Sequence, residues 1–151
     1  MKISIGSDHG GFELKELIKA HLLKDGNEVL DFGTTNKETS VDYPDYAYKA
    51  ALALSQGKVD FGIVVCTTGI GVSIVANKIK GVRCALVTNL EQAKLTRLHN
   101  NSNVLALGQK NQDNELALKI VDTFLNTDFS GEERHQRRIN KITAIEEENH
   151  E

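Results

Sequence analysis

Apolar residues along the chain follow two alternating patterns. Short runs rich in valine, isoleucine, leucine and alanine indicate β-strands, and the run at 60–66 is almost continuously apolar. A continuous run of this kind is typical of a strand that is buried on both faces of a parallel sheet. Strands are predicted at residues 2–6, 28–32, 60–66, 83–87 and 104–107.

The segments between these runs have a helical period, with apolar residues every three or four positions and charged residues on the opposite face. Gly26 is suited to a left-handed cap at the end of the first helix, and Pro44 is suited to the first turn of the second. Helices are predicted at residues 12–24, 44–56, 72–80, 90–98, 116–125 and 132–148.

Strands that alternate with helices predict an α/β fold, here a three-layer α/β/α sandwich on a five-stranded parallel sheet with right-handed connections. The 151 residues contain no linker, repeat or low-complexity segment. We therefore expect one domain over residues 1–151, with 146–151 as a flexible tail.

Composition narrows the classes of function. The net charge of -3 and the lack of a Lys/Arg-rich run give no reason to expect nucleic acid as a partner. No apolar run approaches the ~18–20 residues of a membrane span. The two cysteines, Cys66 and Cys84, have no metal-type spacing and cannot form a disulfide framework. A cytoplasmic protein without membrane contact is expected.

Candidate chemistry lies at the ends of the predicted strands, because ligands of open α/β sheets bind at the carboxyl ends of the strands. After the first strand, Asp8 and His9 precede Gly10 and Gly11. This segment is either a tight turn in which Asp8 caps the next helix, or an acid–histidine pair placed for proton transfer. The sequence alone leaves both interpretations open.

Cys66 ends the third strand and precedes Thr67, Thr68, Gly69 and, two residues later, Gly71. A free cysteine is more often a small buried residue than a catalytic one. Here, however, loop N–H groups and a helix N-terminus would stabilise a thiolate, and the threonine hydroxyls could stabilise an oxyanion. Cys84 lies inside a predicted strand and is interpreted as a core residue.

Two further segments have both an ordinary and a functional interpretation. His99 and Asn100 lie at the end of the fourth predicted helix, as terminators or as a second proton-transfer histidine with an amide donor. Arg134 and Arg138 lie one turn apart on the last helix, as a solvated basic face or as two guanidinium groups that bind one phosphate. No segment shows the His/carboxylate cluster of a catalytic metal site.

Together these segments resemble the ribose-5-phosphate isomerase B family, which also includes galactose-6-phosphate isomerase subunits and allose-6-phosphate isomerases. The resemblance covers nearly the whole chain and is carried by residues 6–12, 42–44, 66–71, 76–78, 99–100, 103–108 and 134–138. It implies the strand order 2-1-3-5-4 and a homodimer, in some members a tetramer, with active sites shared between two subunits. It implies neither metal nor other cofactor.

The resemblance also implies an activity and roles for the candidate residues. The expected reaction interconverts ribose 5-phosphate and ribulose 5-phosphate, a step of the pentose phosphate pathway, through an enediolate. Asp8 and His99 would open the sugar ring, Cys66 would move the proton between C1 and C2, and Thr68 would stabilise the enediolate oxygen. The implied binding residues are Thr67, Gly69 and Gly71 of the loop, His9, Arg134 and Arg138 for the phosphate, and Asn100, which with His99 would come from the neighbouring subunit.

Three positions depart from the family pattern. Thr67 stands where the family usually has glycine, which raises the question of a narrower pocket or a restricted backbone. Lys110 replaces an arginine that contacts the phosphate in many members, and it keeps the charge without the fork of donors. One extra residue lies near 131–133. The alternatives to the expected activity are isomerisation of allose or galactose 6-phosphate and a non-catalytic sugar-phosphate sensor.

Overall fold

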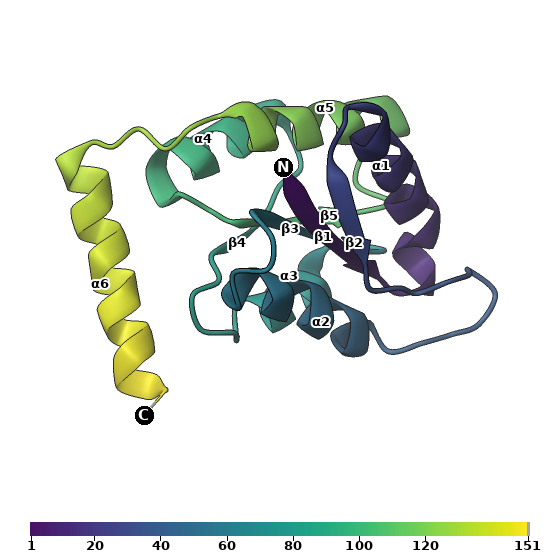
Figure 1. The fold of residues 1–151 in the computed structure, drawn as a ribbon, viewed down its shortest axis with the longest axis horizontal. Helices are drawn as coiled ribbons and strands as arrows, with labels where there is room; N and C mark the ends of the chain where they lie inside the picture. Colours follow the sequence, from purple (N-terminus) through teal and green to yellow (C-terminus); the bar gives the residue numbers. More distant parts are fainter. Residues whose placement is uncertain (151) are drawn as a thin grey trace.

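The strands of the protein, in a computed structural model that describes residues 1–150, form one parallel sheet in the order β2-β1-β3-β5-β4 (Figure 1). The strands are β1 (Lys2–Ser7), β2 (Glu28–Asp31), β3 (Phe61–Cys66), β4 (Cys84–Leu86) and β5 (Val104–Gly108). All four pairings are parallel. The predicted fold class, the five strands and their order are confirmed.

Helices cover both faces of this sheet and make the sandwich (Figure 1). One face carries α1 (Phe12–Lys24), α4 (Leu90–Asn100) and α5 (Asn114–Asn126). The other carries α2 (Tyr43–Ser55) and α3 (Ile70–Ala76). A 3-10 turn, η1 (His9–Gly11), leads from β1 into α1.

The apolar run of β3 is explained by these two layers. Ile63 and Val65 belong to the core cluster beneath α1, α4 and α5, whereas Val64 and Cys66 belong to the cluster beneath α2 and α3. Successive side chains of a strand point to opposite faces, so a strand covered on both sides must be apolar throughout. The Cys66 side chain therefore lies on the α2–α3 side of the sheet.

The last helix, α6 (Glu133–Asn149), stands beside the sandwich and makes its main contact with α4 (Figure 1). Ile139 is buried, but Ile142 and Ile145 are exposed. The expected tail from residue 146 is helical as far as Asn149, and Glu146 accepts a hydrogen bond from the N–H of Gly81 at 2.9 Å. Residue 151 lies outside the described part of the chain.

One predicted helix is too long. The apolar period suggested a helix from Val72 to about residue 80, but α3 ends at Ala76. The side chain of Asn77 turns the chain toward β4, because it donates to the carbonyl of Cys84 at 3.0 Å and accepts from its N–H at 2.8 Å. Ile79 packs against the core from a turn.

Candidate active site

The carboxyl ends of β1, β3 and β5 lie side by side and carry the first group of candidate residues. In the sheet register Ser7 pairs with Val65, and Cys66 pairs with Gly108. Asp8, the thiol of Cys66 and the segment after β5 are therefore at the same edge of the sheet. This is the edge where ligands of parallel α/β sheets bind.

Asp8 caps the turn that follows β1. Its Oδ1 accepts a hydrogen bond from the N–H of Gly11 at 3.0 Å, and the residue is buried. Oδ2 makes no hydrogen bond with another residue of the described chain. Asp8 thus caps the 3-10 turn η1 rather than α1 itself, whose N-cap is Gly11, and one carboxylate oxygen is left for a ligand.

His9 follows directly and is oriented by the loop after β2. Its Nδ1 lies 3.1 Å from the backbone nitrogen of Val41, so the N–H of Val41 donates to this ring nitrogen. A neutral ring that accepts at Nδ1 carries its proton on Nε2. His9 can therefore donate a hydrogen bond from Nε2, as a phosphate ligand requires.

The thiol of Cys66 lies in the turn that begins α3. The backbone nitrogen of Gly69 is 3.1 Å from Sγ, and Cys66 is 5% exposed. Gly69 is the N-cap of α3 with a φ of 78°, and a Cβ atom there would lie 2.5 Å from Cδ1 of Leu86. Glycine is therefore needed at this position both for its backbone and for its lack of a side chain.

Thr67, one of the three departures from the family pattern, has room for its side chain because residue 10 beside it is a glycine. A Cβ atom at Gly10 would come within 2.2 Å of the hydroxyl oxygen of Thr67. The backbone of Thr67 is not among the positive-φ positions of the described chain. The threonine side chain thus occupies space that Gly10 leaves free, and the expected restriction on the backbone does not arise.

Contacts with the rest of the chain also hold Thr68, Gly71 and Lys110 in place. Thr68 Oγ1 accepts from the N–H of Ile70 at 3.2 Å, so its hydroxyl proton is free to be donated. Gly71 packs against the ring of Tyr43, because a Cβ at this glycine would lie 2.6 Å from the ring. Lys110 reaches the loop through its backbone, whose N–H donates to the carbonyl of Thr67 at 3.1 Å.

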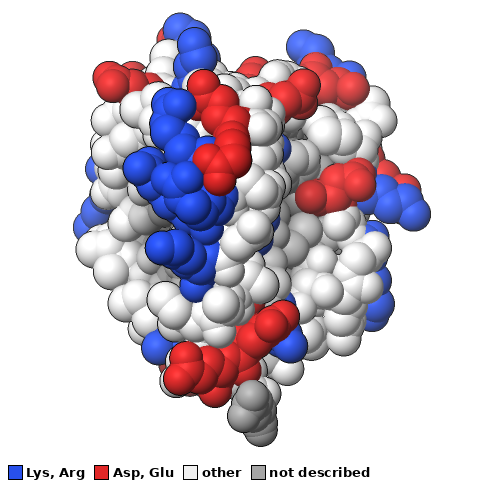
Figure 2. Space-filling view, turned by 90° about the vertical axis from the view of Figure 1, so that its left-hand side faces the viewer, with Lys and Arg blue, Asp and Glu red and all other residues white. Residues whose placement is uncertain are grey.

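A second group of candidate residues lies between α4 and α6. His99 and Asn100 of α4 line a cavity of about 360 Å³ together with Arg134 and Arg138 of α6. Figure 2 shows the face that carries α6, where Lys and Arg side chains form a band with acidic residues at both of its ends. Two guanidinium groups beside a histidine form a site suited to an oxyanion such as phosphate.

His135 also lines this cavity, and the sequence did not single it out. Its ring centroid is 4.4 Å from that of His99, and its Nδ1 is 2.8 Å from the hydroxyl oxygen of Ser130. Burial and the neighbouring charges of Arg134 and His99 hold the pKa of His135 below its usual value. Its position between Arg134 and Arg138 on one helix was the available signal.

Within one chain the two groups lie at opposite ends of the strands. The segment after α4 is at the amino ends of the strands, where the carbonyl of Asn103 accepts from the N–H of Gly62 at 3.0 Å. Cys66 is four residues further along β3, or about 13 Å at ~3.3 Å per residue. Arg134 and Arg138, which the resemblance assigns with His9 to the phosphate, lie beside His99 within the single chain.

Cys84, the first residue of β4, is half-buried and packs against the core cluster beneath α2 and α3, in agreement with its interpretation as a core residue. Burial raises the pKa of the Cys84 thiol to about 12. Within residues 1–150, one group of side chains is close enough to share a metal ion, namely His21 of α1, Asp25 directly after α1, and Asp122 of α5. It belongs to neither group of candidate residues.

No helix of the described residues has the length and apolar composition to cross a membrane.

The chain is similar to known sugar-phosphate isomerases over almost its full length. The model of the Ribose/Galactose Isomerase family matches residues 3–142. Ribose-5-phosphate isomerase B of Escherichia coli is 49% identical over 97% of both chains. The structure of ribose-5-phosphate isomerase B from Clostridium thermocellum superposes with a TM-score of 0.95 at 52% identity, covering 98% of this chain and 99% of that one.

A solved structure from Mycoplasma genitalium, described as ribose-5-phosphate isomerase B with bound ribulose-5-phosphate, has a TM-score of 0.92 at 43% identity and covers 98% of this chain and 97% of its own. The family match, the relatives and the superpositions agree on the fold and on the family. The chain belongs to the ribose/galactose isomerase family.

Proposed function

We propose that the protein is an enzyme that interconverts ribose 5-phosphate and ribulose 5-phosphate. The observation that carries the proposal is the thiol of Cys66, held 3.1 Å from the N–H of Gly69 at the ligand-binding edge of the sheet. The relatives named ribose-5-phosphate isomerase B, and the ribulose-5-phosphate in one of the similar structures, support the choice of a pentose phosphate.

The chemistry proceeds by proton transfer alone. The Cys66 thiolate removes the C2 proton of the open-chain aldose, and the electron pair forms the C1–C2 double bond of an enediolate with negative charge on O1. The thiol returns the proton to C1, while the O2 hydroxyl proton moves to O1 and C2 becomes the ketone. N–H groups and a hydroxyl that face the developing charge lower the barrier, because they stabilise the enediolate more than the sugar. Thr68 and Gly71 supply these donors, while the N–H of Gly69 faces the sulfur of Cys66.

Ring opening and phosphate binding are assigned to the other candidate residues. Asp8 and His99 transfer protons between the ring oxygen and the C1 hydroxyl. His9 donates from Nε2, and Arg134 and Arg138 bind the phosphate with Lys110 as a further cation. Asn100 contacts the sugar hydroxyls. Holding the phosphate away from the reacting carbons orients the sugar at the thiol.

The separation of the two groups supports a homodimer with shared active sites. A single chain presents the thiol loop at one edge of the sheet and His99 with the arginines near the other. Isoleucine side chains are exposed beside both groups, at Ile70 and Ile74 of α3 and at Ile142 and Ile145 of α6. Burying such side chains against a second copy stabilises an assembly that completes the site. Two such dimers could form a tetramer.

Steady-state assays with ribose, allose and galactose phosphates test the assignment. We expect the highest kcat/KM with ribose 5-phosphate, and a hundredfold preference for a hexose 6-phosphate would overturn the choice of substrate. Cys66→Ala should lower kcat by about 10²–10⁴-fold, because a general base contributes this much. Phosphate-dependent binding without exchange of solvent deuterium into the sugar would indicate a sensor instead.

We also propose that the protein works in the cytoplasm. Cys66 and Cys84 are both free thiols, as is usual in a reducing compartment. Fractionation of cells tests this proposal, and recovery of the protein outside the cytoplasmic fraction would contradict it.

A further inference from the structure

Three successive carbonyl groups of the thiol loop are held by the segment that follows β5. The carbonyls of Cys66 and Thr67 accept from the backbone N–H groups of Gln109 at 2.9 Å and Lys110 at 3.1 Å. These two bonds continue the pairing of β3 with β5 beyond the ends of the strands. The third carbonyl, that of Thr68, accepts from a side chain, the Nδ2 of Asn111, at 2.8 Å.

A side chain takes over at this point because the backbone has turned away. The N–H of Asn111 is already bonded to the carbonyl of Gly108 at 3.1 Å. Gly108 also makes room for the amide, since a Cβ there would lie 2.5 Å from Nδ2 of Asn111 and 2.4 Å from the carbonyl carbon of Thr68. The contact between Asn111 and Thr68 therefore depends on a close approach that glycine permits.

The orientation of the Thr68 carbonyl decides where the N–H of Gly69 points. In a trans peptide the carbonyl and the N–H lie in one plane and point in opposite directions. With its carbonyl directed to Asn111, the Thr68–Gly69 peptide directs its N–H toward Sγ of Cys66, 3.1 Å away. One rigid unit thus connects an exposed amide on the β5–α5 segment to the buried thiol.

The backbone itself does not fix this orientation. Rotating the peptide by half a turn would move the φ of Gly69 from 78° into the negative range, which every residue can adopt. The rotated peptide would present its carbonyl oxygen to the thiol and would disfavour a thiolate. A hydrogen bond to the Thr68 carbonyl is what distinguishes the two states.

We propose that Asn111 is a positioning residue that locks the Thr68–Gly69 peptide, so that the Gly69 N–H stabilises the thiolate of Cys66. Its effect on the thiol is a property of the free protein, and its effect on turnover rests on the proposed isomerase function. The Asn111 side chain acts through the Thr68 carbonyl, to which it donates its hydrogen bond.

The test compares Asn111→Leu, which keeps the shape and removes the donor, with Asn111→Asp, which places an acceptor before the carbonyl. Asn114→Asp, an exposed position on α5, is the control for added charge. All are made in a Cys84→Ala background, which leaves Cys66 as the single thiol. The rate of alkylation by iodoacetamide is measured against pH without substrate, and urea unfolding verifies that each variant is folded.

We expect the midpoint pH of alkylation to rise by about one unit in both Asn111 variants, since a hydrogen bond to a charged group is lost. The Asn114→Asp control should keep the midpoint of its parent. With ribose 5-phosphate, kcat should fall about tenfold in the Asn111 variants at similar KM, as expected for a change confined to the chemical step.

An unchanged alkylation midpoint in folded Asn111→Leu would overturn the proposal, whatever the turnover. An equal rise in Asn114→Asp and Asn111→Asp, without one in Asn111→Leu, would overturn it too, because charge alone would then account for the effect. A raised midpoint in the Asn111 variants, together with a parent protein that isomerises no sugar phosphate, would uphold the positioning role and refute the proposed function.

Discussion

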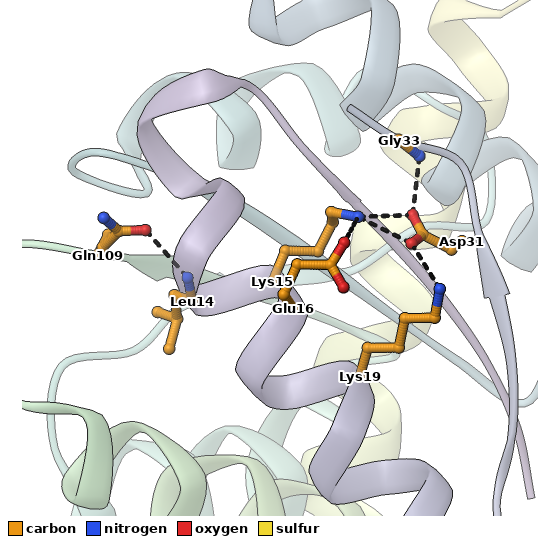
Figure 3. Close-up of polar contacts among 7 residues, drawn as sticks. All are labelled: Leu14, Lys15, Glu16, Lys19, Asp31, Gly33 and Gln109. Atoms are coloured by element: carbon orange, nitrogen blue, oxygen red, sulfur yellow. Dashed lines mark hydrogen bonds and ion pairs between the residues drawn. The ribbon is translucent and has the colours of Figure 1, made fainter. Parts of the chain in front are cut away.

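The ammonium group of Lys15 and the carboxylate of Asp31 form an ion pair that joins α1 to the end of β2 (Figure 3). The Lys15 side chain is 1% exposed and donates to both carboxylate oxygens, at 2.9 and 2.8 Å. Asp31 also accepts from Lys19 at 3.1 Å and from the N–H of Gly33 at 2.9 Å. The carbonyl of Gly33 in turn accepts from the N–H of Ser7, directly before Asp8.

The two partners of this pair should not be equally costly to remove. Asp31→Asn leaves the buried ammonium of Lys15 without its main partner, and we expect a loss of about 3 kcal/mol in the free energy of unfolding. Lys15→Met fills the same space without a charge, while Asp31 keeps Lys19 and Gly33, so we expect a loss below about 1.5 kcal/mol. Urea unfolding at neutral pH measures both, and a larger loss for Lys15→Met would contradict this account.

The same pair makes the stability of the protein depend on pH in acid. Burial alone would raise the pKa of Asp31, but hydrogen bonds from Lys15, Gly33 and Lys19 outweigh it, and the pKa is lowered. A carboxyl with a lowered pKa in the folded state stabilises the protein above its unfolded pKa of about 3.9, and this contribution is lost as the pH falls further. In Asp31→Asn the decrease of stability below this pH should therefore be smaller.

Gly69 should tolerate substitution less well than another glycine with a similar backbone. Gly69 and Gly26 have φ values of 78° and 84°, but a Cβ at Gly26 meets nothing within 4 Å. Gly26→Ala should cost about 1 kcal/mol for the left-handed backbone alone. Gly69→Ala adds overlap with Leu86 and with the backbone of Leu107, so we expect about 3 kcal/mol.

Thermal unfolding of the two variants measures this difference, and isomerase assays show whether activity follows it. Gly26→Ala should retain full turnover, whereas Gly69→Ala should lose at least tenfold because the N–H that faces Cys66 is displaced. Equal stabilities of the two variants would mean that the overlap of an alanine Cβ at position 69 with Leu86 and Leu107 does not lower the free energy of unfolding.

His135 should make the protein less stable in mild acid. Its pKa is below the usual value, because of burial first and the charges of Arg134, His99 and Arg138 second, while Glu132 acts in the opposite direction. The folded state therefore binds this proton less readily than the unfolded state, and stability is lost as the pH falls below about 6.5.

His135→Gln keeps a hydrogen-bonding side chain and removes the titration. We expect its melting temperature to fall less between pH 7.5 and 5.5 than that of the parent, measured in the same buffers. Parallel curves for the two proteins would show that the ring of His135 does not titrate in this range.

Sequence patterns predicted the fold well because each strand and helix carries its own period. The apolar run of β3 and the glycines around Cys66 are local signals, and they placed the thiol loop correctly. The burial of Lys15 was not predicted, since the helical period put it among Glu13, Glu16 and Lys19 on the polar face. Its partner Asp31 lies on another element, so only the packing of α1 against β2 brings the two together.

The site was predicted less completely than the fold for a similar reason. His135 reads as one more polar residue of a charged helix, and its contact with His99 arises only when α6 packs on α4. The resemblance assigns His9, Arg134 and Arg138 to one phosphate, but within a single chain His9 follows β1 whereas both arginines line the cavity beside His99. Sequence order does not say which end of the sheet a helix reaches, so this grouping needs a second subunit and stays a prediction. Because α4 leads from β4 to the start of β5, its last turn lies at the amino ends of the strands, away from His9 at their carboxyl ends.

This separation predicts that two inactive proteins can restore activity together. Cys66→Ala lacks the proposed base and His99→Ala lacks the proposed ring-opening residue, so each homodimer has two defective sites. If Cys66 acts with His99 of the partner subunit, a heterodimer has one site with both defects and one with neither. Random exchange places half of the dimers in this class, and activity should approach about a quarter of that of the parent.

Mixing the two variants under conditions of subunit exchange, followed by assays with ribose 5-phosphate, measures the recovery. Mixing Cys66→Ala with Thr68→Ala is the matched control, because both changes lie in the same loop and no exchange can create an intact site. Heterodimers are verified by a size difference between tagged subunits. Heterodimer formation without recovered turnover would show that each chain completes its own site, and the cavity beside His99 would then need another role.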